Sequence, residues 1–242
     1  MKALLLILLA ATTLGAGPIA AQDDFEEFDE FDEFEEEYTQ EVVTVSDPLY
    51  AVNQMMFDIN DRLYFMVIKP LARSYRKVTP EPARISLKNF FSNLATPGRF
   101  ANCLLQGKGT EANTEFRRFL MNSTVGLLGL ADPAKDKGLI QTNEDLGQTL
   151  AKYGIGNGIY MVFPFLGPST LRDSVGRLGD SMTNPIVYVK HTETYLVLAL
   201  TRSANEHSFR LGDYEALKED MVDPYTAMRD AYIQYRQQQI KE

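Results

Sequence analysis

The sequence predicts an all-helical domain, and three observations carry that prediction. Apolar residues recur at spacings of three or four from 49 to 67, as an amphipathic helix requires. A second apolar run, at 195–200, fits a helix that is either buried or facing lipid. Between these runs, helical patterns and start signals such as Thr110 with Glu111 predict three more helices, at 84–93, 97–106 and 109–125.

The first helix is unusually apolar. Asp47 is placed to cap its amino terminus and Pro48 to occupy its first position, while Pro70 is expected to end or kink it. Further apolar residues widen its apolar arc well beyond one stripe, namely Met55, Phe57, Tyr64, Phe65, Met66 and Ile68. A helix that is apolar on most sides must be buried or must face lipid. The sequence leaves these two options open.

The chain begins with the pattern of an export signal. Lys2 precedes an apolar run at 3–14 and small residues that end at Ala21, so residues 1–21 are predicted to be a signal peptide. The run is short for crossing a bilayer, although an uncleaved amino-terminal anchor remains an alternative. The protein is therefore expected to act outside the cytoplasm.

Residues 22–44 form a predicted spacer that is acidic and rich in phenylalanine. Within it, residues 23–38 read DDFEEFDEFDEFEEEY and hold eleven acidic residues, whereas the whole chain has a net charge of −9. The remainder of the chain is therefore slightly basic. Phenylalanines every three positions do not build a narrow helical face. The segment is either a disordered spacer or a docking motif for a basic partner or divalent cations.

Residues suited to catalysis or cofactor binding are scarce. His191 and His207 are the only histidines, the zinc-ligand spacings are missing, and neither a dinucleotide fingerprint nor a Walker A motif occurs. We expect no metal, no cofactor and no nucleic-acid partner. The single cysteine, Cys103, is most simply a small buried hydrophobe. A hydrolytic triad remains an alternative, built from Ser169, one histidine, and Asp173 or Asp180.

Several motifs resemble the MlaA/VacJ family of outer-membrane proteins, which move misplaced phospholipids. The main stretch runs from Asn143-Glu144-Asp145-Leu146-Gly147-Gln148 through Tyr153-Gly154 to Leu171-Arg172-Asp173. Matching pieces occur in the same order between Asp47 and Tyr232, including Asp47-Pro48-Leu49, Asn53, Phe57, Asn60, Pro82-Ala83-Arg84, Asn89-Phe90, Leu105-Gln106-Gly107, Asn122-Ser123-Thr124 and Asp223-Pro224-Tyr225.

This resemblance implies a fold and a function. The fold is a single ring- or horseshoe-shaped helical domain, lying in the membrane plane around an amphipathic channel. We expect it to span residues 45–236 and to be followed by a polar tail at 237–242. The implied function is removal of mislocalised phospholipid from the outer leaflet of the outer membrane. The implied partners are the membrane, its phospholipid, a periplasmic carrier of the MlaC type and a trimeric porin.

The resemblance also suggests functional residues. Phe57, Asp58, Ile59 and Asn60 match the region of the first helix where short deletions make the family's pore leak lipid. The apolar stretch with Leu127, Leu128 and Leu130 resembles a membrane-facing hairpin, although local sequence fits a core turn equally well. Candidate contacts for lipid headgroups are Arg117, Arg118 and Arg172, although the first two are also common on an ordinary solvated face.

One feature departs from the family. Its members usually carry a lipid on a cysteine at the mature amino terminus, but the only cysteine here, Cys103, lies far from the signal. We therefore expect an unlipidated protein on the periplasmic side of the outer membrane, held by its apolar surface or a partner. Two further hypotheses remain: a surface protein that works through its acidic aromatic tail, and a phospholipase.

Overall fold

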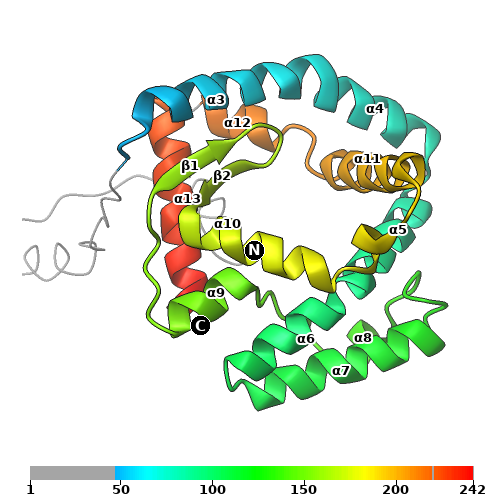
Figure 1. Cartoon of the computed structure of the whole chain (residues 1–242). Coiled ribbons are helices and arrows are strands. Elements are labelled where there is room, and N and C mark those ends of the chain that lie inside the picture. The colour runs from blue at the N-terminus through cyan, green and yellow to red at the C-terminus, as the bar shows by residue number, and fades with distance from the viewer. Residues whose placement is uncertain (1–46, 220, 242) are drawn as a thin grey trace, which may run out of the picture. The chain divides into compact units, whose positions relative to one another are not determined.

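The structure, a computed structural model, describes residues 47–219 and 221–241. The chain divides into two compact units, residues 1–42 and 43–242, and the described residues belong to the second. Within this unit the helices follow one another around a ring (Figure 1). The predicted signal peptide, at 1–21, and the acidic spacer, at 22–44, lie outside the described residues.

The predicted all-helical class is confirmed, with one small exception. The helical elements are α3 (Tyr50–Leu63), η1 (Tyr64–Ile68), α4 (Lys69–Val78), α5 (Glu81–Leu94), α6 (Thr96–Leu105), α7 (Gly109–Thr124), α8 (Pro133–Asp136), α9 (Leu146–Lys152), α10 (Leu171–Thr183), η2 (Pro185–Tyr188), α11 (Thr192–Ser208), α12 (Asp213–Glu219) and α13 (Pro224–Lys241). The exception is a pair of strands, β1 (Tyr160–Phe163) and β2 (Gly167–Thr170). The predicted helices at 84–93, 97–106 and 109–125 correspond closely to α5, α6 and α7.

The first helix differs from its prediction at both ends. It begins at Tyr50, and Asp47 does not cap it, because its carboxylate instead accepts hydrogen bonds from Asn53 and Tyr225. Pro70 does not end the helical path, because α4 continues through it, and the kink expected as the alternative stays a prediction. A π-helical turn, η1, precedes the proline, with the Lys69 amide bonded to the Tyr64 carbonyl. The wider turn helps to accommodate a residue that lacks an N–H and crowds the preceding turn.

The two strands form an antiparallel hairpin that the sequence did not predict. Tyr160 pairs with Thr170, and Phe163 pairs with Gly167. At the tip, Phe165 has a φ of 64°, in the left-handed region that favours glycine. Strands of four residues are too short for an alternation of apolar and polar residues to be recognised in the sequence. The turn between them consists of Pro164, Phe165 and Leu166.

Helices α10 and α13 contact β2 of the hairpin, and α9 packs against α10 and α13 (Figure 1). A Cβ added to Gly176 of α10 would lie 2.4 Å from the backbone nitrogen of Gly147 in α9, so position 176 needs glycine. The buried hydrophobic cluster next to them consists of Tyr160, Val162, Tyr225 and Ile233. Because α13 continues to Lys241, the predicted domain end at residue 236 falls inside a helix.

Polarity is inverted relative to a soluble protein. Buried polar and charged residues outnumber buried hydrophobic ones, and exposed large hydrophobic residues occur on nearly every described helix. In α3 the buried residue is Asn53, while Val52, Met55 and Ile59 are exposed. Most apolar side chains of the first helix and of residues 195–200 are exposed, so full burial is wrong for both, and contact with lipid stays a prediction. None of the described helices is long and apolar enough to cross a membrane.

Candidate functional site

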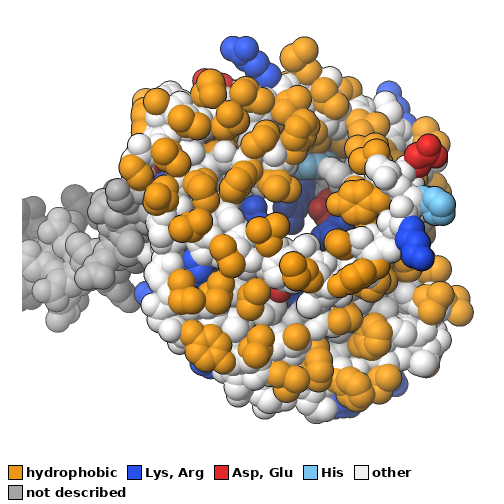
Figure 2. All heavy atoms as spheres, in the orientation of Figure 1, with side chains coloured by type: hydrophobic (Ala, Val, Ile, Leu, Met, Phe, Trp, Pro, Cys, Tyr) orange, Lys and Arg blue, Asp and Glu red, His pale blue; other side chains and the backbone are white. Residues whose placement is uncertain are grey.

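A cavity of about 620 Å³ lies where the ring of helices encloses an opening. Figure 2 shows this opening near the centre of the viewed face, with charged side chains inside it and hydrophobic side chains around it. The lining comes from α6, α10, η2, α11, the 141–144 segment and the hairpin tip. Its apolar members include Leu166, Ile186, Val187, Tyr195 and Ala199. The cavity is therefore amphipathic.

Most charges on this lining are already paired. Arg99 donates to the fully buried Glu115 at 2.8 Å, and Glu144 accepts from Lys108 at 2.7 Å. Asp180 accepts from Asn102 and from the Leu146 amide, but burial outweighs these bonds and raises the pKa of its carboxyl group. These groups are fixed by the fold and give the lining a rigid polar side.

Arg177 differs from these paired groups. Its side chain is exposed on the lining, and its guanidinium donates to the Pro168 carbonyl at 3.1 Å. No carboxylate lies within ion-pair distance of it among the described residues. A guanidinium beside an apolar wall can bind a phosphate and leave room for acyl chains. Sequence reasoning missed Arg177, although its i, i+3 spacing from Asp180 placed both on one helical face.

Two of the three predicted headgroup arginines are not available to a ligand. Arg118 is buried, donates to Asp132 at 2.8 Å and also bonds the Leu139 carbonyl. Arg172 is buried and donates to Asp173 at 3.1 Å. The prediction of headgroup contacts is wrong for these two, because their charges are satisfied within the fold. Arg117 is exposed on α7 and remains a candidate.

The predicted hairpin leucines lie on the loop between α7 and α8. The relative exposures of Leu127, Leu128 and Leu130 are 71%, 70% and 42%, so these residues are not core packing. Leu127 and Leu128 both have positive φ angles, of 53° and 60°. The loop backbone is nevertheless held, because the amides of Leu128 and Gly129 bond carbonyls at the end of α7. The core-turn alternative is therefore wrong.

The base of this loop explains the role of Arg118. Asp132 accepts hydrogen bonds from both Arg118 and Asn122 of α7, and the Asn122 carboxamide oxygen accepts from the Ala134 amide at 3.2 Å. These contacts tie the start of α8 to α7. Arg118 therefore positions the exposed leucines and does not itself face a ligand.

The predicted gating segment lies at the carboxyl half of α3. Phe57 packs edge-on against Tyr225, with ring centroids 5.8 Å apart, while Asp58 and Ile59 are exposed. Asn60 contacts the β-hairpin, donating to the Phe163 carbonyl and accepting from the Phe165 amide, each at 2.8 Å. The segment therefore touches both α13 and the hairpin.

The alternative catalytic triad is not assembled. Ser169 is fully buried, and its hydroxyl bonds Ser174 at 3.0 Å and the Thr170 carbonyl. Within the described residues neither histidine is hydrogen-bonded to Ser169. His207 lies beside the Tyr64 ring, where burial lowers its pKa. Residues 47–219 and 221–241 also hold no cluster of ligands suited to a metal.

The signature stretch recognised in the sequence builds a charged junction, which we define as Asp145, Arg172, Asp173, Tyr232 and Arg236. Arg236 of α13 forms bidentate bonds with Asp173, at 3.0 Å each, and with Asp145, at 2.6 and 2.9 Å. Burial opposes ionisation of Asp173, but the bonds from Arg236 and Tyr232 hold the pKa of its carboxyl group below the usual value. The junction joins α9, α10 and α13 and does not face the cavity.

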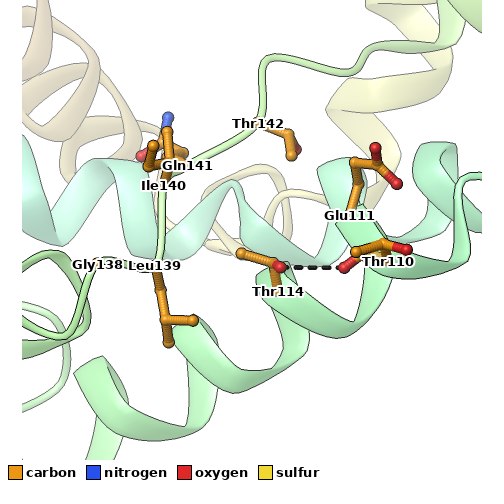
Figure 3. Close-up of a pocket in the computed structure, with 8 residues that line it drawn as sticks. All are labelled: Thr110, Glu111, Thr114, Gly138, Leu139, Ile140, Gln141 and Thr142. Carbon is orange, nitrogen blue, oxygen red and sulfur yellow. Dashed lines mark hydrogen bonds between the residues drawn. The ribbon is translucent and has the colours of Figure 1, made fainter.

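A second, smaller cavity of about 350 Å³ lies between α7 and the 138–142 segment (Figure 3). Its side chains include Thr110, Glu111 and Thr114, and the Thr114 hydroxyl donates to the Thr110 carbonyl at 3.0 Å. No cation lines it, and the Ile140 side chain is largely exposed. Cys103, buried nearby with its Sγ 3.6 Å from the Thr142 hydroxyl, confirms its predicted packing role. This cavity offers little specific chemistry.

Comparisons with known proteins agree with the geometry. Residues 45–239 match the family described as MlaA lipoprotein. The chain is 34% identical over 193 residues to the intermembrane phospholipid transport system lipoprotein MlaA of Escherichia coli strain K12, covering 78% of this chain and 76% of that protein. It is 30% identical over 200 residues to an uncharacterised protein of Rickettsia conorii, covering 82% of this chain and 80% of that protein.

A solved structure supports the same assignment. The solved chain bears the description "Structural basis for maintenance of bacterial outer membrane lipid asymmetry". Its sequence is 31% identical to this chain, and the two structures superpose with a TM-score of 0.73. The match covers 81% of this chain and 100% of the solved chain. Sequence, fold and the ring-enclosed cavity thus agree, and the chain belongs to the MlaA family.

Proposed function

We propose that this protein is the outer-membrane component of a phospholipid transport system that maintains lipid asymmetry. It removes mislocalised phospholipid from the outer leaflet through the central cavity. The observation that carries this proposal is the inverted polarity of the ring, with an apolar exterior around an amphipathic opening. Relatives named for intermembrane phospholipid transport support it.

Free energy explains why such an opening is needed. Moving a diacyl phospholipid into water exposes on the order of 30 methylenes at about 0.8 kcal/mol each, or roughly 24 kcal/mol. A lining that is apolar on one side and polar on the other removes most of that cost, because acyl chains and headgroup each meet a compatible surface. Leu166, Val187 and Tyr195 supply apolar lining, and Arg177 supplies a cation for the phosphate.

The exterior fits a position within one leaflet of the bilayer. Exposed hydrophobic residues on α3, α11 and the α7–α8 loop give the ring apolar surface without a spanning helix among the described residues. Leu127, Leu128 and Leu130 are the proposed membrane-facing tip of that loop. Burying such side chains in the acyl region stabilises an interfacial protein. The ring would then lie in the membrane plane on the periplasmic side of the outer membrane.

Delivery requires partners beyond this chain. We propose that lipid leaving the cavity passes to a soluble periplasmic carrier of the MlaC type, and that a trimeric porin holds the ring in the outer membrane. We also propose export through residues 1–21 and a mature amino terminus near Gln22 without a lipid. The apolar exterior then provides the membrane affinity that acyl chains provide in lipidated relatives.

A lipid-asymmetry assay tests the function. In a host strain lacking this protein, the amount of phospholipid in the outer leaflet should rise. Expression of the wild-type chain should then restore the lipid asymmetry. Arg177→Gln should restore it poorly and Arg177→Lys partly, since lysine keeps the charge but loses the bidentate geometry. Arg210→Gln, an exposed arginine outside the cavity lining, is the matched control and should behave as wild type. Normal asymmetry in the deletion strain would refute the proposal.

A further inference from the structure

The β-hairpin is held along its outer edge by two asparagine side chains of α3. The Asn53 carboxamide donates to the Tyr160 carbonyl at 3.1 Å and accepts from the Val162 amide at 2.9 Å. The Asn60 carboxamide repeats this pattern with the Phe163 carbonyl and the Phe165 amide, at 2.8 Å each. Each side chain thus bonds β1 or its turn as a neighbouring strand would.

The spacing of the two asparagines matches the strand. Seven residues of α-helix rise about 10.5 Å, and three residues of extended strand span about 10 Å. Asn60 therefore forms its hydrogen bonds with the hairpin three residues further along the chain than Asn53 does. The register of α3 against the hairpin is set by this match, and a shift of either segment would break at least one pair of bonds.

The two ends of this contact differ in accessibility. Asn53 is almost fully buried, and its amide nitrogen also donates to the Asp47 carboxylate at 2.8 Å. Asn60 is only partly buried, and its bond from the Phe165 amide is exposed. Asn53 is thus a fixed anchor. Asn60 holds the more exposed end of the hairpin, since Phe165 and Leu166 are exposed whereas Tyr160 and Val162 are buried.

The residue that Asn60 restrains is itself strained. Phe165 has a positive φ, which a residue other than glycine keeps only where the surroundings hold it. The next residue, Leu166, lies on the lining of the central cavity. A release of the Phe165 amide would allow the turn to relax and would move Leu166 relative to the opposite wall.

We infer that Asn60 is a positioning residue for lipid passage, because it fixes the hairpin tip so that Leu166 narrows the central cavity. This inference rests on the proposed function and adds the side chain through which α3 acts on the opening. Asn60 does not contact lipid. Its loss should leave the ring folded and widen or loosen the passage.

A distance measurement tests the positioning directly. Spin labels at Leu166→Cys and at Val187→Cys, an η2 residue of the same lining, are attached in a Cys103→Ala background of the full mature chain. The expected result is a narrow distance distribution that broadens or shifts in Asn60→Ala. Gln54→Ala, which removes an exposed carboxamide from the same helix, should leave it unchanged. An unchanged distribution in Asn60→Ala would overturn the inference.

A second readout, outer-leaflet phospholipid in cells, uses unlabelled variants. Asn60→Ala and the tip variant Leu166→Ala should both raise it above wild type, at normal protein level. If Asn60→Ala is poorly folded, Asn60→Asp keeps the acceptor for the Phe165 amide but not the donor, and should show an intermediate effect. A displaced tip with wild-type lipid levels overturns the role in passage. If the wild-type chain does not restore asymmetry, the proposed function fails, while the label distances still decide whether Asn60 places the tip.

Discussion

The charged junction and the α7–α8 loop both depart from the usual pattern of a soluble protein. The junction buries charged side chains, whereas the loop exposes apolar ones. At the junction, Asp173 is only 3% exposed and shares its charge with two arginines. In the loop, Leu127 and Leu128 are more than two-thirds exposed on a strained backbone. The contrast separates two tasks: buried ion pairs fix how the helices meet, and exposed leucines define what the ring contacts.

The energetic consequences should differ accordingly. A buried charge depends on its partners, so the loss of one partner leaves the other uncompensated. An exposed leucine has little packing to lose, so its replacement changes the surface more than the fold. Substitutions in the two regions should therefore separate stability from membrane engagement.

The largest effect is expected at the junction. Asp173→Asn keeps the shape of the side chain but removes the carboxylate that faces Arg172 and Arg236. Breaking a buried pair typically costs about 3–5 kcal/mol, so we expect a large fall in the free energy of unfolding of detergent-purified protein. Glu206→Gln removes the carboxylate of an exposed pair with Arg202 and should cost about 0–1 kcal/mol. Equal effects of the two variants would contradict the contrast.

In α3 we expect a smaller loss of stability than at the junction, together with a larger change in the amount of phospholipid in the outer leaflet. Deleting Asp58 and Ile59 turns the remainder of the helix by about 200° and carries Asn60 away from the hairpin. Two hydrogen bonds are lost, at about 0.5–1.5 kcal/mol each, while the Asn53 contacts stay. We expect a folded protein that leaks phospholipid to the outer leaflet. A variant present at normal level that behaves like a simple deletion of the gene would refute gating by this segment.

The pH dependence of stability follows from Asp173. Its pKa in the folded protein is lowered, so the unfolded chain binds a proton more readily. The carboxylate therefore contributes stability that is fully present above its ordinary pKa of about 3.9. That stability is lost as the pH falls through the lower folded value. The free energy of unfolding of the wild type should decrease as the pH falls below about 4. That of Asp173→Asn should decrease less over the same range, because this variant lacks the carboxylate. Parallel profiles would contradict this assignment.

Sequence reasoning reached the fold class and the family but only part of the site. Periodicity and capping predicted α5, α6 and α7 closely, because such signals are local. The roles of Arg118 and Arg172 were misjudged because their partners, Asp132 and Asp173, are recognised only when burial is known. Both partners lie within fifteen residues in the sequence, yet a nearby carboxylate does not show whether an arginine is buried.

The hairpin was missed for a different physical reason. Its strands are stabilised by contacts made over more than a hundred residues, from Asn53 and Asn60 to β1 and its turn. No local pattern encodes a helix side chain that stands in for a neighbouring strand. Arg177 was missed because its exposure on the cavity lining depends on how α10 meets the hairpin and η2. The hairpin and Arg177 are therefore placed by contacts between segments that lie far apart in the sequence.

The smallest effect on stability is expected at the loop, with Leu128→Asp. Because Leu128 is exposed, the new carboxylate meets solvent or detergent, and the free energy of unfolding should change by about 0.5 kcal/mol or less. The charge should still weaken flotation of the protein with phospholipid vesicles, since a carboxylate is costly in the acyl region. Ala134→Asp, in the adjacent α8, is the matched control: its side chain is fully buried, so it should unfold the protein. If Leu128→Asp is degraded as Ala134→Asp is, then the leucine packs against protein in the cell. If it is stable and still floats with vesicles as wild type does, then the loop does not enter the bilayer.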